Sequence, residues 1–385
     1  MKEAKGQIEG VIRLSGKGIG YVSLDPKGPS IEIDSTNLKT ALHGDQVRVR
    51  ILEEALPVRN GEETNQAGEV VEIMERRKME FVGTLEAENG FTYLVPDDKR
   101  VYKDSLIDQK HLQGAKAGEK VLAKIIKWDD PKKDPLGEVV EIIGAPGAHE
   151  TEMLSIVYDR GFKSIFPEAV ETEAKALKLA EAKDLPEEAK NRRDFRKILT
   201  FTVDPIDAKD FDDALSFQTL PDGNYEVGIH IADVSHYVTP GTALDTEARK
   251  RATSIYLVDR TIPMLPEILS NDLCSLREGE DKLTFATIIT MTPAGEVIKT
   301  EFDKTIIHSA KRFTYEEGQA VLDSKEGPFA PALLTLNKLA YALRKKKIAA
   351  GAITFENEEI KFQLDASGQP IKVYKKTRTD IHLLI

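Results

Sequence analysis

Residues 198–217 read Ile198-Leu-Thr-Phe-Thr-Val-Asp204-Pro205-Ile-Asp207-Ala-Lys-Asp210-Phe-Asp212-Asp213-Ala-Leu-Ser-Phe217, two apolar runs with an acidic segment between them. Both runs are rich in residues that favour β-strands. Pro205 favours an extended backbone at Asp204. Bringing five carboxylates together costs free energy unless positive charge lies among them. We therefore expect two core strands joined by an acidic loop that holds a cation, rather than a solvated run of charge.

The residue types of this loop limit which cation it could hold. Aspartate oxygens without Cys or His are the donors that Mg²⁺ and Mn²⁺ prefer. Two such ions about 4 Å apart can stabilise the attacking and leaving oxygens of a phosphodiester displacement. A structural calcium site is one alternative, but the EF-hand turn glycine and terminal Glu are absent. An Asp-x-Asp phosphatase is another, but Ala214 stands where its Thr is expected. The spacing favours metal catalysis and leaves both alternatives open.

The N-terminal part of the chain contains an internal repeat. Gly68-Glu-Val-Val-Glu-Ile73 recurs as Gly137-Glu-Val-Val-Glu-Ile142, and Gly44-Asp-Gln-Val-Arg-Val49 is echoed by Gly118-Glu-Lys-Val-Leu-Ala123. Segments 18–22 and 90–95 match loosely in the same order. Two units of about 70 residues with short, alternating strands predict two small β-barrels, and the OB-fold is the leading candidate.

Aromatic residues in these barrels suggest contacts with nucleic acid. The segment Ser15-Gly-Lys-Gly-Ile-Gly-Tyr-Val22 resembles the strand on which cold-shock domains present stacking aromatics, although Ile19 stands where those proteins usually carry Phe. Stacking on an aromatic ring is worth ~1–3 kcal/mol per base. We expect Tyr21, Phe91 and Tyr93 to contact single-stranded RNA. The alternative is a purely structural barrel, in which these residues only bury the hydrophobic core.

Composition excludes several classes of protein. The 385 residues carry a net charge of −11 with no basic half, so bulk charge gives no argument for a nucleic-acid partner. No apolar window reaches the ~18 residues of a membrane span, and we expect no signal peptide, because the first residues contain no apolar run. The one cysteine, Cys274, allows no intramolecular disulfide and is interpreted as a small buried hydrophobe. We expect a cytoplasmic protein with no membrane partner.

The region between the barrels and the acidic loop is predicted to be a connector at 147–200. Residues 171–183 are rich in Ala, Glu, Lys and Leu and predict an exposed helix. Asp184 is predicted to cap a new short helix with Pro186 in its first turn. This divides the chain into a first barrel at 1–73, a second at 74–146, the connector, and a C-terminal domain at 201–385.

Several motifs in order resemble one known family. Residues 202–215 are similar to the signature of the catalytic domain of the ribonuclease II / ribonuclease R family, and the match continues through 228–237, 252–257, 262–266 and 269–276. Two cold-shock-like barrels in front are also the family's order, so the resemblance covers essentially the whole chain. It implies an α+β multidomain fold: two N-terminal OB-fold (cold-shock-like) β-barrels followed by a partial mixed α/β RNB catalytic domain.

The resemblance also implies a function and a set of site residues. It implies a 3′-5′ exoribonuclease that degrades single-stranded RNA processively to nucleoside 5′-monophosphates, with Mg²⁺, or Mn²⁺, as cofactor. The family's metal-binding acidic quartet matches Asp204, Asp210, Asp212 and Asp213. Asp212 matches the carboxylate on which the rate depends most. Tyr256 matches an aromatic that packs on a terminal base, and Tyr315 matches one that holds the ribose end.

Other conspicuous residues have structural interpretations. Asp207 lies outside the quartet and is expected to form hydrogen bonds within its own loop. His230, His236 and His308 lie in strand-like runs and are expected to be core histidines with satisfied hydrogen bonds. Asp233 could cap or orient the acidic loop.

The chain ends within the region that resembles the family's catalytic domain. Residues 376–385 resemble the start of a long helix, and the family's later half carries an arginine that neutralises the phosphate in the transition state. We therefore expect a chain truncated within the catalytic domain, and slow cleavage by it alone. The alternative is a catalytically impaired fragment that acts only as a single-stranded RNA-binding protein.

Overall fold

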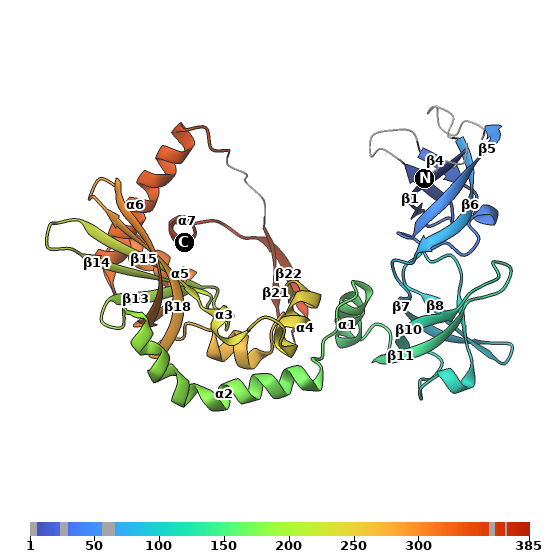
Figure 1. The fold of residues 1–385 in the computed structure, drawn as a ribbon, viewed down its shortest axis with the longest axis horizontal. Coiled ribbons are helices and arrows are strands. Elements are labelled where there is room, and N and C mark those ends of the chain that lie inside the picture. The colour runs from blue at the N-terminus through green and yellow to red at the C-terminus, as the bar shows by residue number, and fades with distance from the viewer. Residues whose placement is uncertain (1–5, 24–29, 56–65, 354–358, 366–367) are drawn as a thin grey trace. The chain divides into compact units, whose positions relative to one another are not determined.

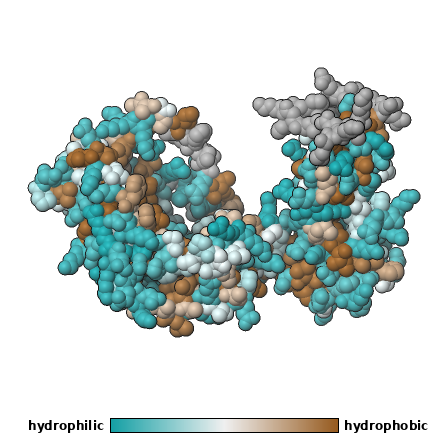
Figure 2. Space-filling view, in the orientation of Figure 1, coloured by the Kyte–Doolittle hydropathy of each residue, from teal (hydrophilic) through white to brown (hydrophobic). Residues whose placement is uncertain are grey.

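A computed structural model describes residues 6–23, 30–55, 66–353, 359–365 and 368–385. The chain divides into two compact units, residues 1–164 and 165–385, and each is described by itself (Figure 1). Figure 2 shows that hydrophilic residues cover much of the visible face of both units, as the content of charged residues predicts. Within the described residues, no helix is both long enough and apolar enough to cross a bilayer.

The first domain of unit one is a six-stranded sheet with strand order β1-β5-β6-β4-β3-β2. Its strands are β1 (Gln7–Val11), β2 (Arg13–Leu14), β3 (Gly20–Ser23), β4 (Ser30–Ile33), β5 (Gln46–Ala55) and β6 (Gln66–Glu75), with a 3₁₀ turn η1 (Ser35–Asn37) after β4. Alternate strand residues such as Ile33, Val47 and Val70 fill its core, as the alternating pattern predicts.

The second domain of unit one is a closed barrel with order β10-β11-β9-β8-β7. Its strands are β7 (Glu80–Glu88), β8 (Phe91–Pro96), β9 (Ser105–Ile107), β10 (Lys120–Lys127) and β11 (Leu136–Gly144), with η2 (Gln109–His111) after β9. Helix α1 (His149–Asp159) covers one side of this barrel, where Tyr158 packs against Val82, Leu122 and Ile143.

The repeated glycine explains why the two domains share one plan. Gly68 of β6 pairs with Ile33 of the parallel strand β4, and Gly137 of β11 pairs with Ile107 of the parallel strand β9. A Cβ on Gly68 would lie 2.5 Å from a methyl carbon of Ile31, and one on Gly137 would lie 2.8 Å from a methyl carbon of Ile107. Each parallel pair therefore needs a residue without a side chain at this position.

The second unit is built on a mixed seven-stranded sheet with order β12-β19-β18-β15-β14-β13-β20. Its strands are β12 (Arg193–Asp194), β13 (Leu199–Asp204), β14 (Asp213–Thr219), β15 (Tyr225–Ala232), β18 (Asp281–Met291), β19 (Val297–His308) and β20 (Lys311–Thr314). The β13–β20 and β12–β19 pairs are parallel, and the other pairs are antiparallel. Two small ladders join β16 (Ile255–Tyr256) to β17 (Thr261–Ile262) and β21 (Ile360–Leu364) to β22 (Pro370–Lys375).

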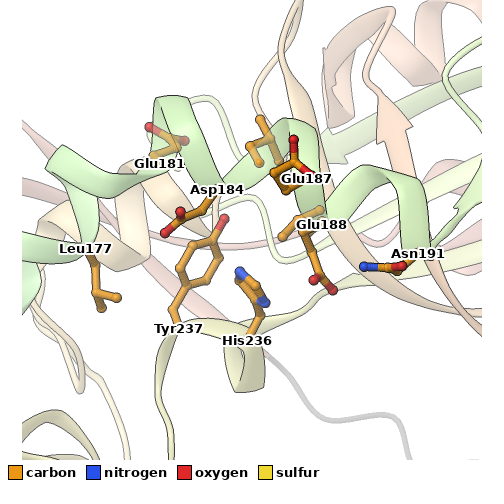
Figure 3. A pocket seen from close by; sticks show the side chains of 10 residues that line it. Leu177, Glu181, Asp184, Glu187, Glu188, Asn191, His236 and Tyr237 are labelled. Carbon is orange, nitrogen blue, oxygen red and sulfur yellow. The ribbon is translucent and has the colours of Figure 1, made fainter.

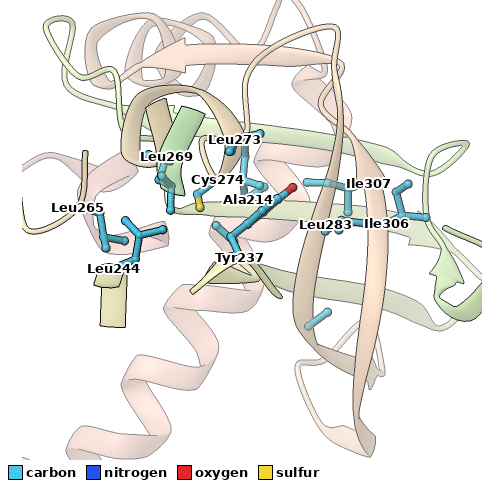
Figure 4. Close-up of a cluster of buried hydrophobic side chains, with 14 of the residues drawn as sticks. Ala214, Tyr237, Leu244, Leu265, Leu269, Leu273, Cys274, Leu283, Ile306 and Ile307 are labelled. Atoms are coloured by element: carbon cyan, nitrogen blue, oxygen red, sulfur yellow. The ribbon is translucent and has the colours of Figure 1, made fainter. Parts of the chain in front are cut away.

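Helices bury both faces of this sheet. The first face is covered by α2 (Glu168–Glu188), α3 (Val234–Tyr237), α4 (Ala243–Arg251) and a π-helical turn η4 (Leu269–Leu273), with η3 (Ala189–Asn191) after α2. Figure 4 shows part of this cluster, including Leu244, Leu269 and the buried Cys274. The second face is covered by α5 (Tyr315–Ser324), α6 (Ala330–Ala349) and α7 (Asp380–Leu384). Ala232 and Val227 of β15 pack into opposite clusters, as alternation along a strand requires.

The predicted break at Asp184 is wrong. Helix α2 runs without interruption through Asp184 to Glu188, with Pro186 in its last turn. Pro186 has no N–H, so the carbonyl of Ala182 loses its helical hydrogen bond. Ala182 is exposed to solvent. Val170, Ala174 and Leu185 of the helix pack against the first core cluster, and this packing favours a continuous helix.

Candidate catalytic site

The acidic loop joins two neighbouring strands of the second unit at one end of the sheet. Asp204 is the last residue of β13, and Asp213 is the first residue of β14, its antiparallel neighbour. Asp210 and Asp212 lie in the loop between them. Two core strands joined by an acidic loop are what the sequence pattern predicts, and the fold brings the four aspartates of the quartet to one edge of the sheet.

Contacts with residues distant in the sequence hold the loop. The backbone N–H of Phe211 donates to Ser275 Oγ at 3.1 Å, and this hydroxyl donates to the carbonyl of Lys209 at 2.8 Å. The N–H of Leu276 donates to the Phe211 carbonyl at 2.9 Å. Arg312 donates to the carbonyl of Pro205 and lies over the Phe211 ring. Sequence reasoning missed the roles of Ser275 and Arg312, because only the folded chain brings them to the loop.

Asp204 is a buried carboxylate with an unusual environment. It is 8% exposed, and its Oδ2 atom is buried without a hydrogen-bond partner among the described residues. Burial raises the pKa of Asp204 to about 6, the charge of Asp213 adds to this increase, and Arg312 opposes it. A buried oxygen without a donor is expected to bind a proton or a cation.

Asp212 and Asp213 also lie in a crowded acidic environment. The pKa of Asp212 is raised by burial and then by the charges of Asp210 and Asp213. Asp212 is exposed to solvent. Burial also raises the pKa of the half-buried Asp213. These aspartates therefore repel one another in the absence of a cation.

The carboxylates are near one another without forming a closed ligand set. Among the residues that the structure describes, no three Asp, Glu, His or Cys side chains are arranged to hold a metal ion. The donor set still fits a hard divalent cation, because it consists of oxygens and includes the unpartnered Oδ2 of Asp204. Side-chain movements would be needed to bring three oxygens to one ion.

Tyr256 lies beside the acidic loop. It belongs to the short β16–β17 ladder, and the residue is 67% exposed. Its hydroxyl donates to Asp210 Oδ2 at 3.1 Å. Burial of the hydroxyl and the charge of Asp210 raise the pKa of Tyr256, so the phenol stays protonated at neutral pH. The structure thus brings a solvent-facing aromatic ring to the acidic loop.

Tyr315 lies near the Asp204 end of the loop. Asp204 pairs with Thr314 of β20, and Thr314 caps α5 with Glu317, which places Tyr315 in the first turn. Its ring stacks on His382 with centroids 4.1 Å apart and planes inclined by 15°. Burial and the charges of Asp204 and Asp213 raise the pKa of Tyr315. Both tyrosines of the predicted site therefore lie within electrostatic range of the quartet.

The three aromatic residues predicted to contact RNA through the barrels lie in unit one. Phe91, at the start of β8, is 56% exposed. Tyr93 is half-buried further along the same strand, and Tyr21 is half-buried in β3. Of these rings, Phe91 presents the most accessible surface for stacking on a base.

The structure tests the non-catalytic roles predicted for His230, Asp207 and Asp233. His230 is fully buried and bonded to Ser216 and Thr305, so the prediction of a satisfied core histidine is confirmed. Asp207 is exposed, and its side chain forms no hydrogen bond within the described part of the chain, so that prediction is wrong. Asp233 pairs with the buried Arg192 at 2.7 Å rather than capping the acidic loop.

Three segments of the chain match known domain families. Residues 192–385 match the RNB domain, residues 93–167 match the cold shock domain, and residues 10–73 match the ribonuclease B OB domain. The predicted fold class, two OB-type domains followed by a mixed α/β RNB domain, is thereby confirmed.

Curated relatives are similar along almost the whole chain. Ribonuclease R of Thermotoga maritima is 37% identical over 372 residues, which cover 93% of this chain and 51% of that protein. Ribonuclease R of Escherichia coli is 31% identical over 385 residues, covering 98% of this chain and 46% of that protein. The chain thus spans about half the length of these relatives.

Solved structures share the fold. Mycoplasma genitalium RNase R in complex with ribose-methylated single-stranded RNA superposes with a TM-score of 0.86 at 24% identity, covering 98% of this chain and 59% of that one. Yeast Ssd1, described as a pseudonuclease, superposes with a TM-score of 0.65 at 20% identity, covering 90% of this chain and 48% of that one. At these identities the likeness shows the fold alone.

Proposed function

Because the chain belongs to the ribonuclease II / ribonuclease R family, whose members are metal-dependent exoribonucleases, we propose that the protein hydrolyses single-stranded RNA from its 3′ end. The products are nucleoside 5′-monophosphates, the metal is Mg²⁺, and the protein acts in the cytoplasm. The observation that carries this proposal is the set of four aspartates at the β13–β14 edge, with the unpartnered oxygen of Asp204 among them. We also propose that the first barrel ends at residue 73, the second barrel at residue 146, and the connector at residue 200.

The four aspartates would bind the metal ion. Asp204, Asp210, Asp212 and Asp213 would hold the ion, and the exposed Asp212 would be the carboxylate on which the rate depends most. When bound, the ion supplies positive charge that activates a water molecule and stabilises the phosphate in the transition state. Neutral carboxyl groups bind cations poorly, so the raised pKa of Asp204 makes ion binding compete with protonation.

The two tyrosines would position the RNA end. The hydroxyl of Tyr256 is bonded to Asp210, so this ring keeps a fixed place while its exposed face is available for a terminal base. Tyr315 is fixed by stacking on His382 and by the cap of α5, and its edge would contact the ribose. Correct placement of the terminal nucleotide against the acidic edge accelerates the reaction through proximity.

The experiment compares two aspartates of one loop. Asp212→Asn should reduce release of 5′-monophosphates from a labelled oligoribonucleotide in Mg²⁺ by at least ~10²-fold and leave RNA affinity within about two-fold, because the lost charge matters mainly in the transition state. Asp207→Asn is the matched control, since Asp207 is an exposed carboxylate outside the quartet, and it should cleave at the unsubstituted rate. Equal turnover in the two variants would remove Asp212 from the mechanism.

A single-stranded RNA-binding protein without catalysis is the second candidate function. The observation that favours it is that no three carboxylates among the described residues form a closed metal-ligand set. Titration with Mn²⁺, followed by water proton relaxation, separates the two functions. The nuclease proposal requires Mn²⁺ binding that Asp204→Asn weakens, whereas a pure binding protein would bind RNA equally well with and without divalent ions.

A further inference from the structure

The four aspartates of the quartet lack the countercharge that other acidic side chains of the second unit have. In the pocket at the C-terminal end of α2, Glu181 pairs with Lys178 at 2.6 Å, and Glu188 pairs with Arg192 at 3.0 Å (Figure 3). Within the described residues, no side chain of the quartet forms an ion pair. Carboxylates that lie together repel one another, so the folded loop needs a positive charge nearby even before an ion binds.

Arg312 supplies a positive charge from the neighbouring strand. Strand β20 pairs with β13 in parallel, with Arg312 opposite Thr202. Thr202 and Asp204 are two residues apart on β13, so their side chains lie on the same face of the sheet as that of Arg312. The charge of Arg312 opposes the increase in the pKa of Asp204 that burial causes. This basic residue thus lies beside Asp204, the buried member of the quartet.

Two contacts fix the guanidinium group of Arg312 near both ends of the acidic loop. The group donates a hydrogen bond to the carbonyl of Pro205, the residue after Asp204. Its Cζ atom lies 5.4 Å from the centroid of the Phe211 ring, and Phe211 precedes Asp212 in the chain. A planar guanidinium group can make a directed hydrogen bond and a ring contact at once, which a lysine ammonium group does less well.

Hydrogen bonding alone does not explain the position of Arg312. Its Nε atom is buried and has no hydrogen-bond partner among the described residues, which costs free energy. Glu278 accepts the backbone N–H of Arg312 at 2.8 Å, and within the described ranges the guanidinium group forms no ion pair. Its charge therefore remains available to offset that of the quartet.

We propose that Arg312 is a positioning residue that offsets the negative charge of the acidic loop until a divalent ion binds. This inference rests on the proposed function, because it takes the quartet as the binding site of that ion. Without an ion, the guanidinium group reduces the repulsion among the aspartates and keeps the loop in place. With an ion bound, Arg312 contributes mainly its contacts with Pro205 and Phe211.

Calorimetric unfolding of the whole chain separates the charge of Arg312 from its contacts. Arg312→Lys keeps the charge and Arg312→Gln removes it, while both lose the planar contact with Phe211. The transition of the second unit is the one without a change in Trp128 fluorescence, since Trp128 lies in the first unit. In EDTA, this transition should occur about 4 °C lower in Arg312→Gln than in Arg312→Lys, because the repulsion is then uncompensated.

Saturating MgCl₂ should reduce the difference between the two variants to less than about 1 °C, because the ion then supplies the positive charge. KCl of the same ionic strength controls for screening and should preserve most of the difference, since partly buried charges are screened less. Lys209→Gln is the matched control, because Lys209 is an exposed cation of the same loop. It should shift the transition by less than about 1 °C in either solution.

The proposal is wrong if Arg312→Lys and Arg312→Gln unfold at the same temperature in EDTA, or if Lys209→Gln destabilises as much as Arg312→Gln. It is also wrong if MgCl₂ stabilises the unsubstituted chain but leaves the difference between the two Arg312 variants unchanged. If Arg312→Gln does not fold in EDTA, recovery of its transition in MgCl₂ supports the proposal, and failure to recover refutes it. If MgCl₂ stabilises neither the variants nor the unsubstituted chain, the metal-binding role of the quartet is refuted, whereas the comparison in EDTA still decides whether Arg312 acts through its charge.

Discussion

Replacing Ser275 with Ala tests what holds the acidic loop in shape. The Ser275 hydroxyl accepts the N–H of Phe211 at 3.1 Å and donates to the carbonyl of Lys209 at 2.8 Å, and the residue has no exposed surface. Ser275→Ala removes both hydrogen bonds and fits the same space. The loop remains attached through the bond from Leu276 N–H to the Phe211 carbonyl.

The expected loss of stability in Ser275→Ala follows from the two hydrogen bonds of the Ser275 hydroxyl. A neutral hydrogen bond contributes about 1 kcal/mol to stability, and a buried polar group left without a partner costs about 1–3 kcal/mol. Two bonds are lost, and the loop can turn part of its backbone toward solvent. We expect Ser275→Ala to lower the free energy of unfolding of the second unit by about 2–4 kcal/mol. Displacement of the aspartates should reduce RNA cleavage by up to ~10²-fold.

Hydrogen exchange is the appropriate assay, because the single tryptophan, Trp128, lies in the first unit and does not report on this loop. Mass spectrometry of peptides covering 205–214 should show faster exchange at Phe211 in Ser275→Ala. Ser270→Ala is the control, since its hydroxyl makes only a long 3.5 Å contact with Pro266 O and a 3.3 Å contact with Asn271 Oδ1. Unchanged exchange and stability in Ser275→Ala would refute this account of the loop.

Three further predictions concern pH, the barrels and the exposed tyrosine. Burial lowers the pKa of His230 to about 4 from 6.5, so the unfolded chain binds the proton first and stability falls as pH drops from 6.5 to 4. The loss is roughly 3 kcal/mol at pH 4, and His230→Gln should flatten the pH dependence of urea unfolding, whereas an unchanged slope would contradict it. Phe91→Ala should weaken single-stranded RNA binding by about 1 kcal/mol in fluorescence anisotropy, with strong salt dependence, and salt-insensitive binding would favour a purely structural barrel. Tyr256→Phe should keep RNA affinity because the ring remains, while Tyr256→Ala should lose ~1–3 kcal/mol; equal losses would assign the effect to the hydroxyl.

The local patterns of the sequence were sufficient for much of the fold. Alternating strands and the repeated Gly68 and Gly137 segments predict two similar barrels, because short-range pairing and a tight parallel contact both depend on nearby residues. The apolar runs around residues 204–213 likewise predict two strands joined by an acidic loop. Each of these features depends on side-chain size, charge and spacing along a short segment, which a sequence displays directly.

Tertiary packing decided the rest. Helix α2 continues through Asp184 because its inner face packs on the core, and this outweighs the local cost of Pro186. Ser275 contacts a loop more than sixty residues away in the chain, and Tyr315 stacks on His382 only in the folded protein. Charge, aromatic rings and strand propensity can be recognised directly in the amino-acid sequence. Only the folded structure decided which of them lie together, because contacts between distant residues depend on the packing of the entire core.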